Sequence, residues 1–574
     1  MKLFDNHIDA VSRCRERKSD IWAKVLFVWT PLCCAVPNVA LSVTEPLSVM
    51  ARIANVLLPL GIYWFLITLT RNVGKATLLM FPLMFLAAFQ SVLLKLYGRS
   101  VIAVDMFLNL VTTNPAEVGE LLGNLTAAIA FVAVVYLTPI IMALVSIAKG
   151  WLISDRWRMR QRVLAVVSSL SGLIAMAFSF GAAKAYDPFN DLYPLNAFYN
   201  ICLAVSRDVQ MHNHLASERF TFGASDTHAN DGREVYVLVV GETARADNWQ
   251  LNGYFRNTTP ELVGMSGLTS FRRAFSQSNT THKSVPMLLS SVNAYSFNDS
   301  INEVKSILSA FKEAGYHTAF ISNQRRNHSY IDFFGGEADT CIFVKEMSEG
   351  SEKSGPFYDS DLLPLLDEML NRNYRRQFIV LHTYGSHFNY ADRYPRECAV
   401  FKPDHPLEAI EANHEKLINS YDNTILYTSR LLRDIIGRLD DAGICSAMLY
   451  TSDHGEDIFD DERNLFLHAS PIPSYFQIHV PFIVWMSDSY RSTYPDAARN
   501  VVANARKLVS TSDAFFHTAL DISGISTRVF EARHSVANAL YKESSPVYLN
   551  DHNEAVGLSD AGLSESEILK ITGM

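Results

Sequence analysis

The sequence predicts two unlike parts, an α-helical transmembrane bundle of five spans and then an α/β domain with a mainly parallel sheet. Charged residues make up 19% of the 574-residue chain, and they are scarce before residue 185. After Arg233, short apolar runs rich in β-branched residues alternate with amphipathic helical stretches. The formal net charge is −9. No excess of basic residues is available to neutralise phosphate backbones, so we expect no nucleic-acid binding.

Five stretches before residue 185 contain no charged side chain and are long enough to cross a membrane. A hydrocarbon core about 30 Å thick takes about 20 helical residues. The stretches are 25–43, 53–70, 76–94, 121–148 and 163–183. Five such runs in succession, joined by charged connections, indicate a membrane domain rather than the buried helices of one globular core.

Lys and Arg are unevenly distributed around these spans, and this asymmetry predicts the orientation. They gather in the amino-terminal tail and in the second and fourth connections, whereas the first and third connections hold only Arg52, Lys95 and Arg99. We therefore expect a cytoplasmic tail, a transmembrane domain and an exported catalytic domain, at residues 1–24, 25–185 and 231–574. Residues 186–230, rich in aromatic and turn-forming side chains, are expected to form an interfacial linker; packing on the exported domain is the alternative.

The exported half contains five short apolar runs with amphipathic helical stretches between them. The runs are 235–240, 317–322, 377–382, 447–451 and 481–485, and the helical stretches include 304–314, 362–371 and 423–439. Continuously apolar strands separated by helices predict a mainly parallel sheet that is covered on both faces. Because ligands bind at the carboxyl ends of strands in such sheets, the residues after each run are the candidates for function.

Those positions carry side chains that bind metals. Glu242 follows the first run, His387 follows the third, and Asp453 and His454 follow the fourth. Carboxylate oxygens and imidazole nitrogens suit zinc or manganese. Any one of these residues alone more commonly caps a helix or fixes a loop, so it is their convergence on one sheet edge that predicts a metal site.

Five longer motifs are distributed along the same half of the chain. They are Gly-Glu-Thr-Ala-Arg-Ala-Asp at 241–247, Leu-Asn-Gly-Tyr at 251–254, Leu-His-Thr-Tyr-Gly-Ser-His at 381–387, Tyr-Asp-Asn-Thr at 421–424 and Ser-Asp-His-Gly-Glu at 452–456. Together they resemble the phosphoethanolamine transferases of Gram-negative inner membranes. The resemblance covers nearly the whole chain, and it implies five inner-membrane spans followed by a periplasmic domain of alkaline phosphatase/sulfatase-like fold.

The resemblance also implies roles for individual residues. In that family a threonine nucleophile precedes a Ser-Val-Pro sequence, which here occupies 284–286. The family's spacing selects Thr281 over Thr280, although a hydroxyl at a helix start can also be an N-cap. The implied metal is zinc, with manganese less favoured, and its implied ligands are Glu242, Thr281, Asp453 and His454. His387 and His468 match the family's substrate-site histidines, for which a structural role is the alternative.

Weaker matches concern substrate binding. The connection after the third span resembles an exported loop of the family that is implicated in donor binding, with Asn109, Thr113 and Glu117 as the matching residues. Glu117 would meet an ethanolamine ammonium there, or else is a solvated loop charge. Asn323, after the second run, is a further candidate for binding substrate.

The implied chemistry is a double displacement. Thr281, activated by the metal, attacks the phosphorus of the donor phosphatidylethanolamine, diacylglycerol leaves, and an acceptor oxygen then takes phosphoethanolamine from the threonine. The expected acceptor is lipopolysaccharide, and the choice between a lipid A phosphate and a core sugar stays open. The number of zinc ions also stays open, as does the pairing of Cys202, Cys341, Cys398 and Cys445. We expect a membrane-embedded monomer.

Other functions share parts of this pattern. The principal alternative is a phosphoglycerol transferase, or another phosphoryl-transfer enzyme of the same fold, acting on a different envelope glycan; the Gly-Glu-Thr and Asn-Gly-Tyr motifs argue against it. A sulfatase needs Arg two residues after the proline, and Leu288 stands there. A transporter or sensor with an inactive exported domain would not need a complete set of metal ligands.

Overall fold

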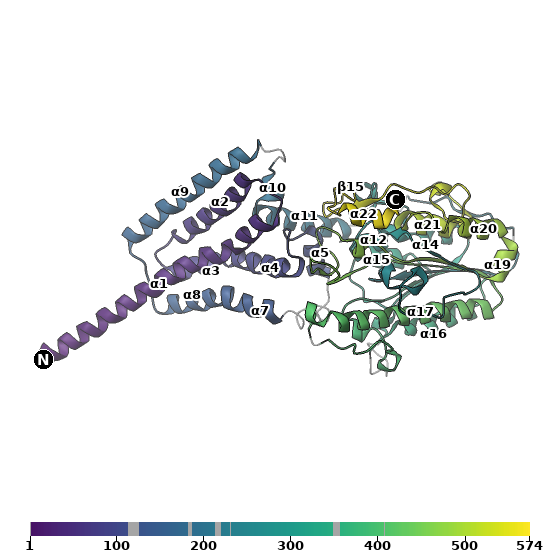
Figure 1. Cartoon of the computed structure of the whole chain (residues 1–574), viewed down its shortest axis with the longest axis horizontal. Coiled ribbons are helices and arrows are strands. Elements are labelled where there is room, and N and C mark those ends of the chain that lie inside the picture. The colour runs from purple at the N-terminus through teal and green to yellow at the C-terminus, as the bar shows by residue number, and fades with distance from the viewer. Residues whose placement is uncertain are drawn as a thin grey trace. The chain divides into compact units, whose positions relative to one another are not determined.

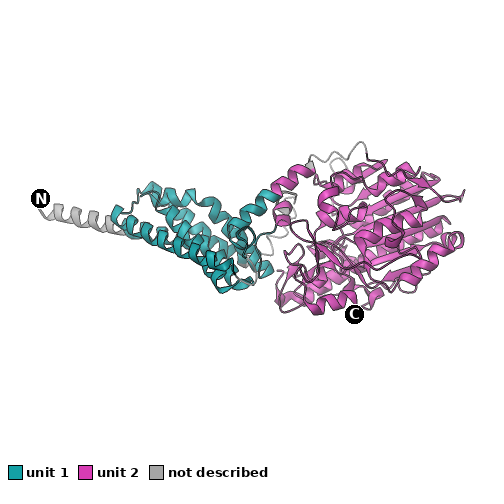
Figure 2. Cartoon of the chain, turned by 90° about the horizontal axis from the view of Figure 1, so that it is seen from above, with its two compact units in different colours: residues 1–103, 125–203 teal, residues 104–124, 204–574 magenta. Residues whose placement is uncertain are grey.

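The chain divides into two compact units (Figure 2). The first comprises residues 1–103 and 125–203, and the second comprises 104–124 and 204–574. The computed structural model describes residues 2–112, 126–181, 186–212, 220–229, 231–347, 356–406 and 408–573. Residues 104–112 form α5 (Val104–Thr112), which follows the third span in the sequence but groups with the second unit.

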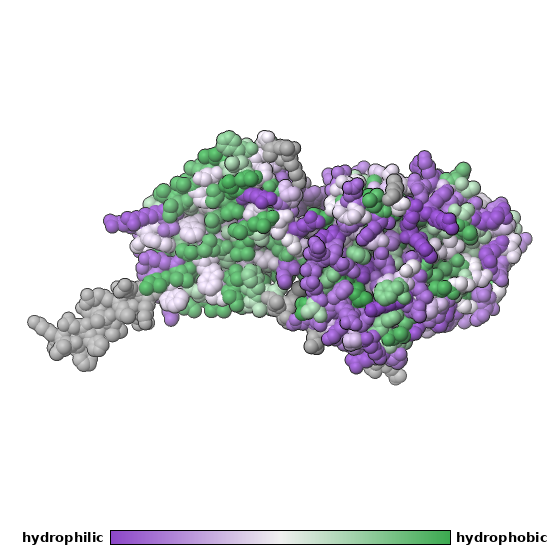
Figure 3. Space-filling model, viewed as in Figure 1, coloured by the Kyte–Doolittle hydropathy of each residue, from purple (hydrophilic) through white to green (hydrophobic). Residues whose placement is uncertain are grey.

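The first unit is a bundle of apolar helices, as predicted. Within the described residues, four helical stretches are long and apolar enough to cross a membrane, and a bent pair of helices supplies the fifth span when it counts as one. The single stretches are Ser19–Thr44 in α1 (Lys2–Thr44), α2 (Val49–Ile67), Ala128–Ala148 and α9 (Asp155–Ser179). Ala128–Ala148 runs through α7 (Thr126–Val132), a π-helical turn (Ala133–Leu137) and α8 (Thr138–Ala148). Apolar side chains cover much of the visible face of these helices (Figure 3).

The third span is broken, which the uninterrupted apolar stretch 76–94 did not predict. α3 (Val73–Leu79) and α4 (Phe81–Tyr97) meet at an angle of 58°. Pro82 lies in the first turn of α4. Proline has no backbone N–H and its ring clashes with the carbonyl four residues earlier, which favours a break in the helix at this position.

Two glycines allow α2 and α9 to pack closely. A Cβ atom added to Gly61 would lie 2.4 Å from Ser169 Oγ, and one added to Gly172 would lie 2.4 Å from the backbone nitrogen of Leu58. Small residues at such contacts let helix backbones approach each other, which is how membrane helices gain packing energy without a hydrophobic driving force.

The second unit is built on a seven-stranded sheet with the order β3-β11-β8-β2-β7-β5-β6. Its strands are β2 (Glu234–Gly241), β3 (Leu268–Phe271), β5 (His317–Ser322), β6 (Thr340–Phe343), β7 (Arg376–His382), β8 (Cys445–Ser452) and β11 (Phe482–Met486). The five strands from β8 to β6 are parallel, and β11 is antiparallel to both of its neighbours. The predicted mainly parallel sheet is therefore confirmed.

Helices cover both faces of this sheet (Figure 1). Tyr236, Leu238 and Val240 of β2 pack in one core with α12 (Thr281–Leu289), α14 (Ile307–Glu313), α15 (Tyr330–Gly336) and α21 (Thr511–Ile522). The alternate residues Val235, Val237 and Val239 pack in a second core with α16 (Leu362–Asn371) and α17 (His414–Asp441). Both faces of the strand are buried, which explains why its sequence is continuously apolar.

Shorter elements complete the described part of the chain. Four strand pairs lie outside the main sheet: β1 (Ser225–Asp226) with β13 (Ile525–Ser526), β4 (Ala274–Phe275) with β12 (Val509–Ser510), β9 (Asp457–Ile458) with β10 (Phe466–Leu467), and β14 (Val547–Leu549) with β15 (Ala555–Gly557). The remaining α-helices are α10 (Pro188–Asp191), α11 (Leu195–His212), α13 (Phe297–Ser300), α18 (Tyr475–Ile478), α19 (Asp488–Thr493), α20 (Pro495–Asn504) and α22 (Glu565–Thr572).

Part of segment 186–230 belongs to the core of the second unit. Phe222 is fully buried, and its ring lies 6.3 Å from that of Phe516 on α21. The backbone next to it is also tied down, because β1 pairs with β13. This end of the segment therefore packs on the sheet domain.

We predict that a fragment of residues 220–574 folds as a soluble domain whose stability depends on Phe222. Phe222→Ala should lower its free energy of unfolding by about 3–5 kcal/mol, since a buried phenylalanine leaves a cavity. Phe255→Ala is the matched control, because Phe255 is 81% exposed and such a change should cost less than about 0.5 kcal/mol. Urea denaturation measures both, and equal effects would contradict the packing of Phe222.

Candidate metal centre

The register of two parallel strands brings together the residues that follow them. Gly241 at the end of β2 pairs with Ser452 at the end of β8, so Glu242 and Asp453 emerge side by side. Each side chain of Glu242, Asp453 and His454 is at most 2% exposed. One ligand atom from each of these three residues lies within 4.8 Å of the other two.

Thr281 adds a fourth oxygen to this cluster. It is the first residue of α12, and its Oγ1 lies 3.3 Å from Glu242 Oε1 and 3.1 Å from His454 Nε2. Thr280 is the N-cap residue, but its side chain makes no capping hydrogen bond, and its Oγ1 lies 3.1 Å from Ser278 Oγ. The structure therefore brings Thr281, and not Thr280, to the carboxylates.

The side chains of the cluster offer more hydrogen-bond acceptors than donors. His454 Nδ1 lies 2.9 Å from the carbonyl oxygen of Gly455, so it donates there and leaves Nε2 with its lone pair. That Nε2 lies 3.3 Å from Asp453 Oδ2 and 3.5 Å from Glu242 Oε1. Asp453 Oδ2 is buried and takes part in no hydrogen bond with the described residues. With Nε2 unprotonated, the Thr281 hydroxyl supplies the only hydrogen that these four side chains direct into the cluster, and it cannot serve all of the acceptor atoms around it.

The pKa shifts of Glu242 and His454 reflect the crowding of negative charge in the cluster. Burial, and next the neighbouring Asp453 carboxylate, raise the pKa of Glu242 to about 7. Burial alone would lower the pKa of His454, yet Asp453 and Glu242 raise it above its ordinary value. Two buried carboxylates and an imidazole lone pair are a donor set that fits a divalent cation, and zinc takes such nitrogen and oxygen ligands.

Hydrogen bonds hold the carboxylates in place. Asp453 Oδ1 accepts from the backbone N–H groups of Thr243 and His454, at 3.1 and 2.7 Å. The Thr243 hydroxyl donates to Glu242 Oε1 at 2.7 Å. Such contacts fix the direction of the remaining lone pairs, as the outer shell of a metal site does.

His468 lies beside the cluster. Its ring centroid is 4.2 Å from that of His454 and 6.1 Å from that of His387. His468 Nδ1 is 2.9 Å from Oε2 of the buried Glu456, whose Oε1 accepts a hydrogen bond from the Tyr390 hydroxyl. Burial raises the pKa of Glu456 to about 8 and lowers that of His468 to about 3. Burial thus disfavours the charged forms of both members of this pair.

His387 is held by different contacts. Its Nδ1 lies 2.6 Å from the carbonyl oxygen of Phe388, and its ring stacks on Tyr384 with centroids 5.0 Å apart. Burial lowers the pKa of His387 well below its ordinary value. Burial thus disfavours the charged form of both candidate histidines.

The structure gives less information on the residues that the sequence predicts to bind substrate. Asn323 is fully buried, and its amide donates to Asp359 Oδ1 at 2.8 Å. Its neighbour Gln324, which the sequence analysis did not single out, faces the cluster, with Nε2 3.3 Å from Glu242 Oε2. Thr113 and Glu117 lie outside the described residues, and of Asn109 the structure describes the backbone in α5.

A buried ion pair next to Thr281 was also not predicted. Lys283 Nζ lies 2.6 Å from Oδ2 of Asp105 in α5, and His282 Nε2 lies 3.1 Å from its Oδ1. Although burial opposes it, Lys283 and then His282 hold the pKa of Asp105 well below its ordinary value. A lone acid in the apolar stretch 101–112 was the available signal. Its partners are far away in the sequence.

Comparison with known proteins identifies the class. Residues 234–525 match the sulfatase family, and because this match spans half of the chain, the protein belongs to that family. The solved structure of lipooligosaccharide phosphoethanolamine transferase A (EptA) from Neisseria meningitidis has the same fold, with a TM-score of 0.70 at 23% identity, covering 90% of this chain and 98% of that one. The predicted combination of membrane helices and sulfatase-like domain is confirmed.

Curated sequences similar to this chain include phosphoethanolamine transferases. Phosphoethanolamine transferase EptA of Escherichia coli K12 is 28% identical over 338 residues, 57% of this chain and 60% of the relative. Kdo(2)-lipid A phosphoethanolamine 7''-transferase of Salmonella typhimurium is 30% identical over 334 residues, 56% of each chain. This chain thus spans less than two thirds of the length of these curated relatives.

The zinc complex of the periplasmic domain of EcEptC from Escherichia coli gives a TM-score of 0.53 at 25% identity, covering 60% of this chain and 98% of that one. The resemblance indicated by the motifs is confirmed.

We predict that Asp453→Asn abolishes stoichiometric zinc binding. The substitution removes an anionic ligand, and the affinity should fall by more than the roughly 10–100-fold that loss of an outer-shell partner costs. Zinc content of the purified full-length protein, together with competition against a chelator, measures the effect.

Asp461→Asn provides the control, because this carboxylate is 39% exposed and pairs with Arg463. It should keep wild-type zinc content. Full zinc occupancy in Asp453→Asn, with unchanged affinity, would show that the carboxylate cluster is not the metal site.

Proposed function

We propose that this protein is a zinc-dependent transferase that moves phosphoethanolamine from phosphatidylethanolamine to lipopolysaccharide through a covalent intermediate on Thr281. We further propose a monomer in the inner membrane, with residues 1–24 in the cytoplasm, 25–185 in the membrane and 186–230 as the linker. The catalytic domain, 231–574, would lie in the periplasm. The names of the relatives, the apolar helices and the metal-ligand cluster support this assignment.

The observation that carries the proposal is the position of the Thr281 hydroxyl. It lies within 3.4 Å of both Glu242 carboxylate oxygens and 3.1 Å from His454 Nε2. A free threonine hydroxyl is a weak nucleophile and needs activation. A zinc ion held by Glu242, Thr281, Asp453 and His454 would favour the deprotonated threonine oxygen and withdraw charge from the phosphoryl oxygens.

The protein's own groups then carry out two matched steps. In the first, the Thr281 hydroxyl gives up its proton, a bond forms between Thr281 Oγ1 and phosphorus, the bond from phosphorus to the diacylglycerol oxygen breaks, and that oxygen takes up a proton. In the second, the acceptor oxygen gives up its proton and bonds to phosphorus, the bond from phosphorus to Thr281 Oγ1 breaks, and the threonine hydroxyl recovers a proton. Burial lowers the pKa of His387 and of His468. A bound phosphate would raise it, so that these histidines could donate hydrogen bonds to the phosphate oxygens and pass a proton to the leaving oxygen.

Positions farther from Thr281 are proposed to serve the substrates. α5 carries Asn109 and precedes Thr113 and Glu117, and Asp105 ties this helix to α12. Asn323 has an indirect role in this scheme, because Asp359 in turn accepts from the backbone N–H groups of Tyr384 and Gly385, just before His387.

We predict that incubation with phosphatidylethanolamine adds the mass of one phosphoethanolamine group to the peptide containing Thr281. Thr281→Ala should abolish the adduct, since it removes the oxygen that forms the covalent bond, and transfer activity should fall by several orders of magnitude. A general acid or base such as His468 typically contributes only about 10²–10⁴-fold. Mass spectrometry of the peptide and a transfer assay measure the two effects.

Thr280→Ala is the neighbouring control, because that hydroxyl is 2% exposed and directed at Ser278. It should retain the adduct. An adduct that survives in Thr281→Ala, or that is lost only in Thr280→Ala, would refute the assignment of the nucleophile.

A further inference from the structure

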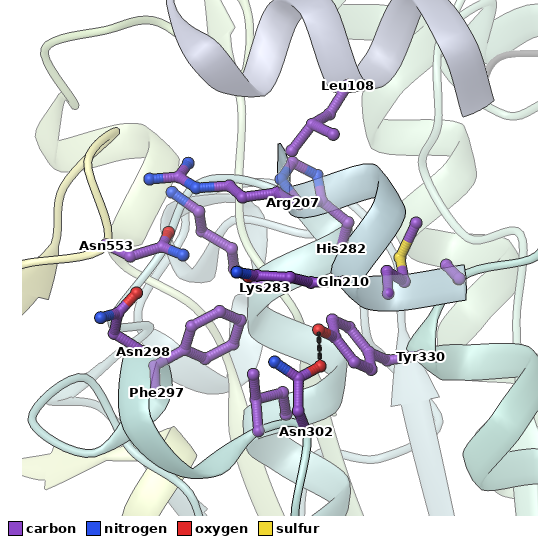
Figure 4. Close-up of a pocket in the computed structure, with 13 residues that line it drawn as sticks. Leu108, Arg207, Gln210, His282, Lys283, Phe297, Asn298, Asn302, Tyr330 and Asn553 are labelled. Atoms are coloured by element: carbon purple, nitrogen blue, oxygen red, sulfur yellow. Dashed lines mark hydrogen bonds between the residues drawn. The ribbon is translucent and has the colours of Figure 1, made fainter. Parts of the chain in front are cut away.

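A hollow opens beside the first turn of α12, next to the candidate nucleophile (Figure 4). It has a volume of about 590 Å³ when the part open to solvent is included. His282 and Lys283, the two residues after Thr281, line it together with Arg207 of α11. Residues two apart in a helix have Cα atoms within about 6 Å but do not share a face, so the hollow lies beside the same helical turn as Thr281.

The lining of this pocket is cationic and rich in amides. Lys283 and Arg207 supply two positive charges, and no Asp or Glu is among the thirteen described residues that line it. The amide side chains are Gln210, Asn298, Asn302 and Asn553. Figure 4 shows four of these side chains along one side of the hollow: Arg207, Lys283, Asn298 and Asn553. Asn302 lies at another side, where its Oδ1 accepts a hydrogen bond from the Tyr330 hydroxyl.

Lys283 and Arg207 are held by groups that do not line the pocket. Lys283 Nζ donates to the carbonyl oxygen of Asn550 at 2.9 Å and pairs with Asp105 at 2.6 Å. Arg207 Nη1 donates to the carbonyl oxygen of Asp551 at 2.7 Å and lies 3.7 Å from Asp105 Oδ1. Asp105 and Asp551 therefore fix the cations without lining the pocket.

The Nε and Nη2 N–H groups of Arg207 are available to donate hydrogen bonds to a ligand. Its side chain is 16% exposed, and no described residue is recorded as accepting a hydrogen bond from its Nε or Nη2. A guanidinium with one edge open can bind a phosphate or carboxylate through two parallel hydrogen bonds.

We propose that this pocket binds an anionic sugar of the acceptor, with its phosphate or carboxylate on Arg207 and Lys283 and its hydroxyls on the surrounding amides. The proposal rests on the proposed function. It assigns the pocket to the acceptor rather than to the donor headgroup, because the lining would present two cations to the ethanolamine ammonium, while the Asp105 carboxylate that pairs with them does not line the pocket. The donor's phosphate, in turn, must reach Thr281 itself.

The test separates the two half-reactions of the full-length protein, with phosphatidylethanolamine as donor and lipopolysaccharide as acceptor. Arg207→Gln should lower kcat/KM for lipopolysaccharide at least about 10-fold, mainly through KM, because it removes charge-assisted hydrogen bonds. The rate of adduct formation on Thr281 should stay unchanged. Arg499→Gln, at a side chain that is 72% exposed on α20, should alter neither rate.

Two results would overturn the proposal: an equal loss of adduct formation in Arg207→Gln, which would indicate a donor or structural role, and no effect on either half-reaction. Lipopolysaccharide stripped of its phosphates identifies the anion. If the phosphate is the ligand, Arg207→Gln should cost nothing further with this acceptor; if a carboxylate is the ligand, the cost should persist.

Failure of the proposed function would be visible separately, as the absence of any adduct in the wild-type protein. In that case, binding of glucose 1-phosphate, followed by broadening of its ³¹P signal, tests the pocket directly. Broadening should be reduced in Arg207→Gln and retained in Arg499→Gln. Equal broadening in both variants would refute an anion site at Arg207.

Discussion

The second unit is organised around acceptor atoms that cannot satisfy one another. Parallel pairing of β2 and β8 places Glu242 beside Asp453, out of water, and His454 turns a lone pair toward both. Burying like charges side by side costs several kcal/mol unless a cation or proton compensates. The remaining hydrogen bonds of the cluster do not relieve this cost; they hold the lone pairs in one direction. A metal cation at the centre of the cluster, or a proton on Glu242, would relieve this cost.

A buried charge also needs compensation two residues along α12, at Lys283, and there the chain supplies an ion pair. There Lys283 supplies the positive charge and Asp105 of α5 the negative one, both nearly buried. This ion pair ties the helix that follows the third span in the sequence to the helix that begins with Thr281. Breaking such a pair by removing one partner typically costs 3–5 kcal/mol, because the other charge is left buried. α5 is thereby fixed next to the nucleophile.

Much of this was predictable from local patterns. Uncharged apolar runs predicted the spans, continuously apolar strands predicted the two-sided sheet, and strand ends predicted Glu242, Asp453 and His454. Features that depend on long-range or single-residue geometry were not predictable. Adjacent residues after a strand point in different directions, and the sequence does not show that Asn323 donates to Asp359 while Gln324 faces the cluster. The partners of Asp105 and of Glu456 depend on packing that no sequence spacing encodes.

Zinc-edge anomalous diffraction from crystals of the full-length protein tests the central claim most directly. The account predicts one strong peak bonded to Glu242, Asp453, His454 Nε2 and Thr281 Oγ1, with metal–ligand distances of about 2.0–2.2 Å. A peak held by His387 and His468 instead, or no peak at the carboxylate cluster in crystals grown with saturating zinc, would contradict it.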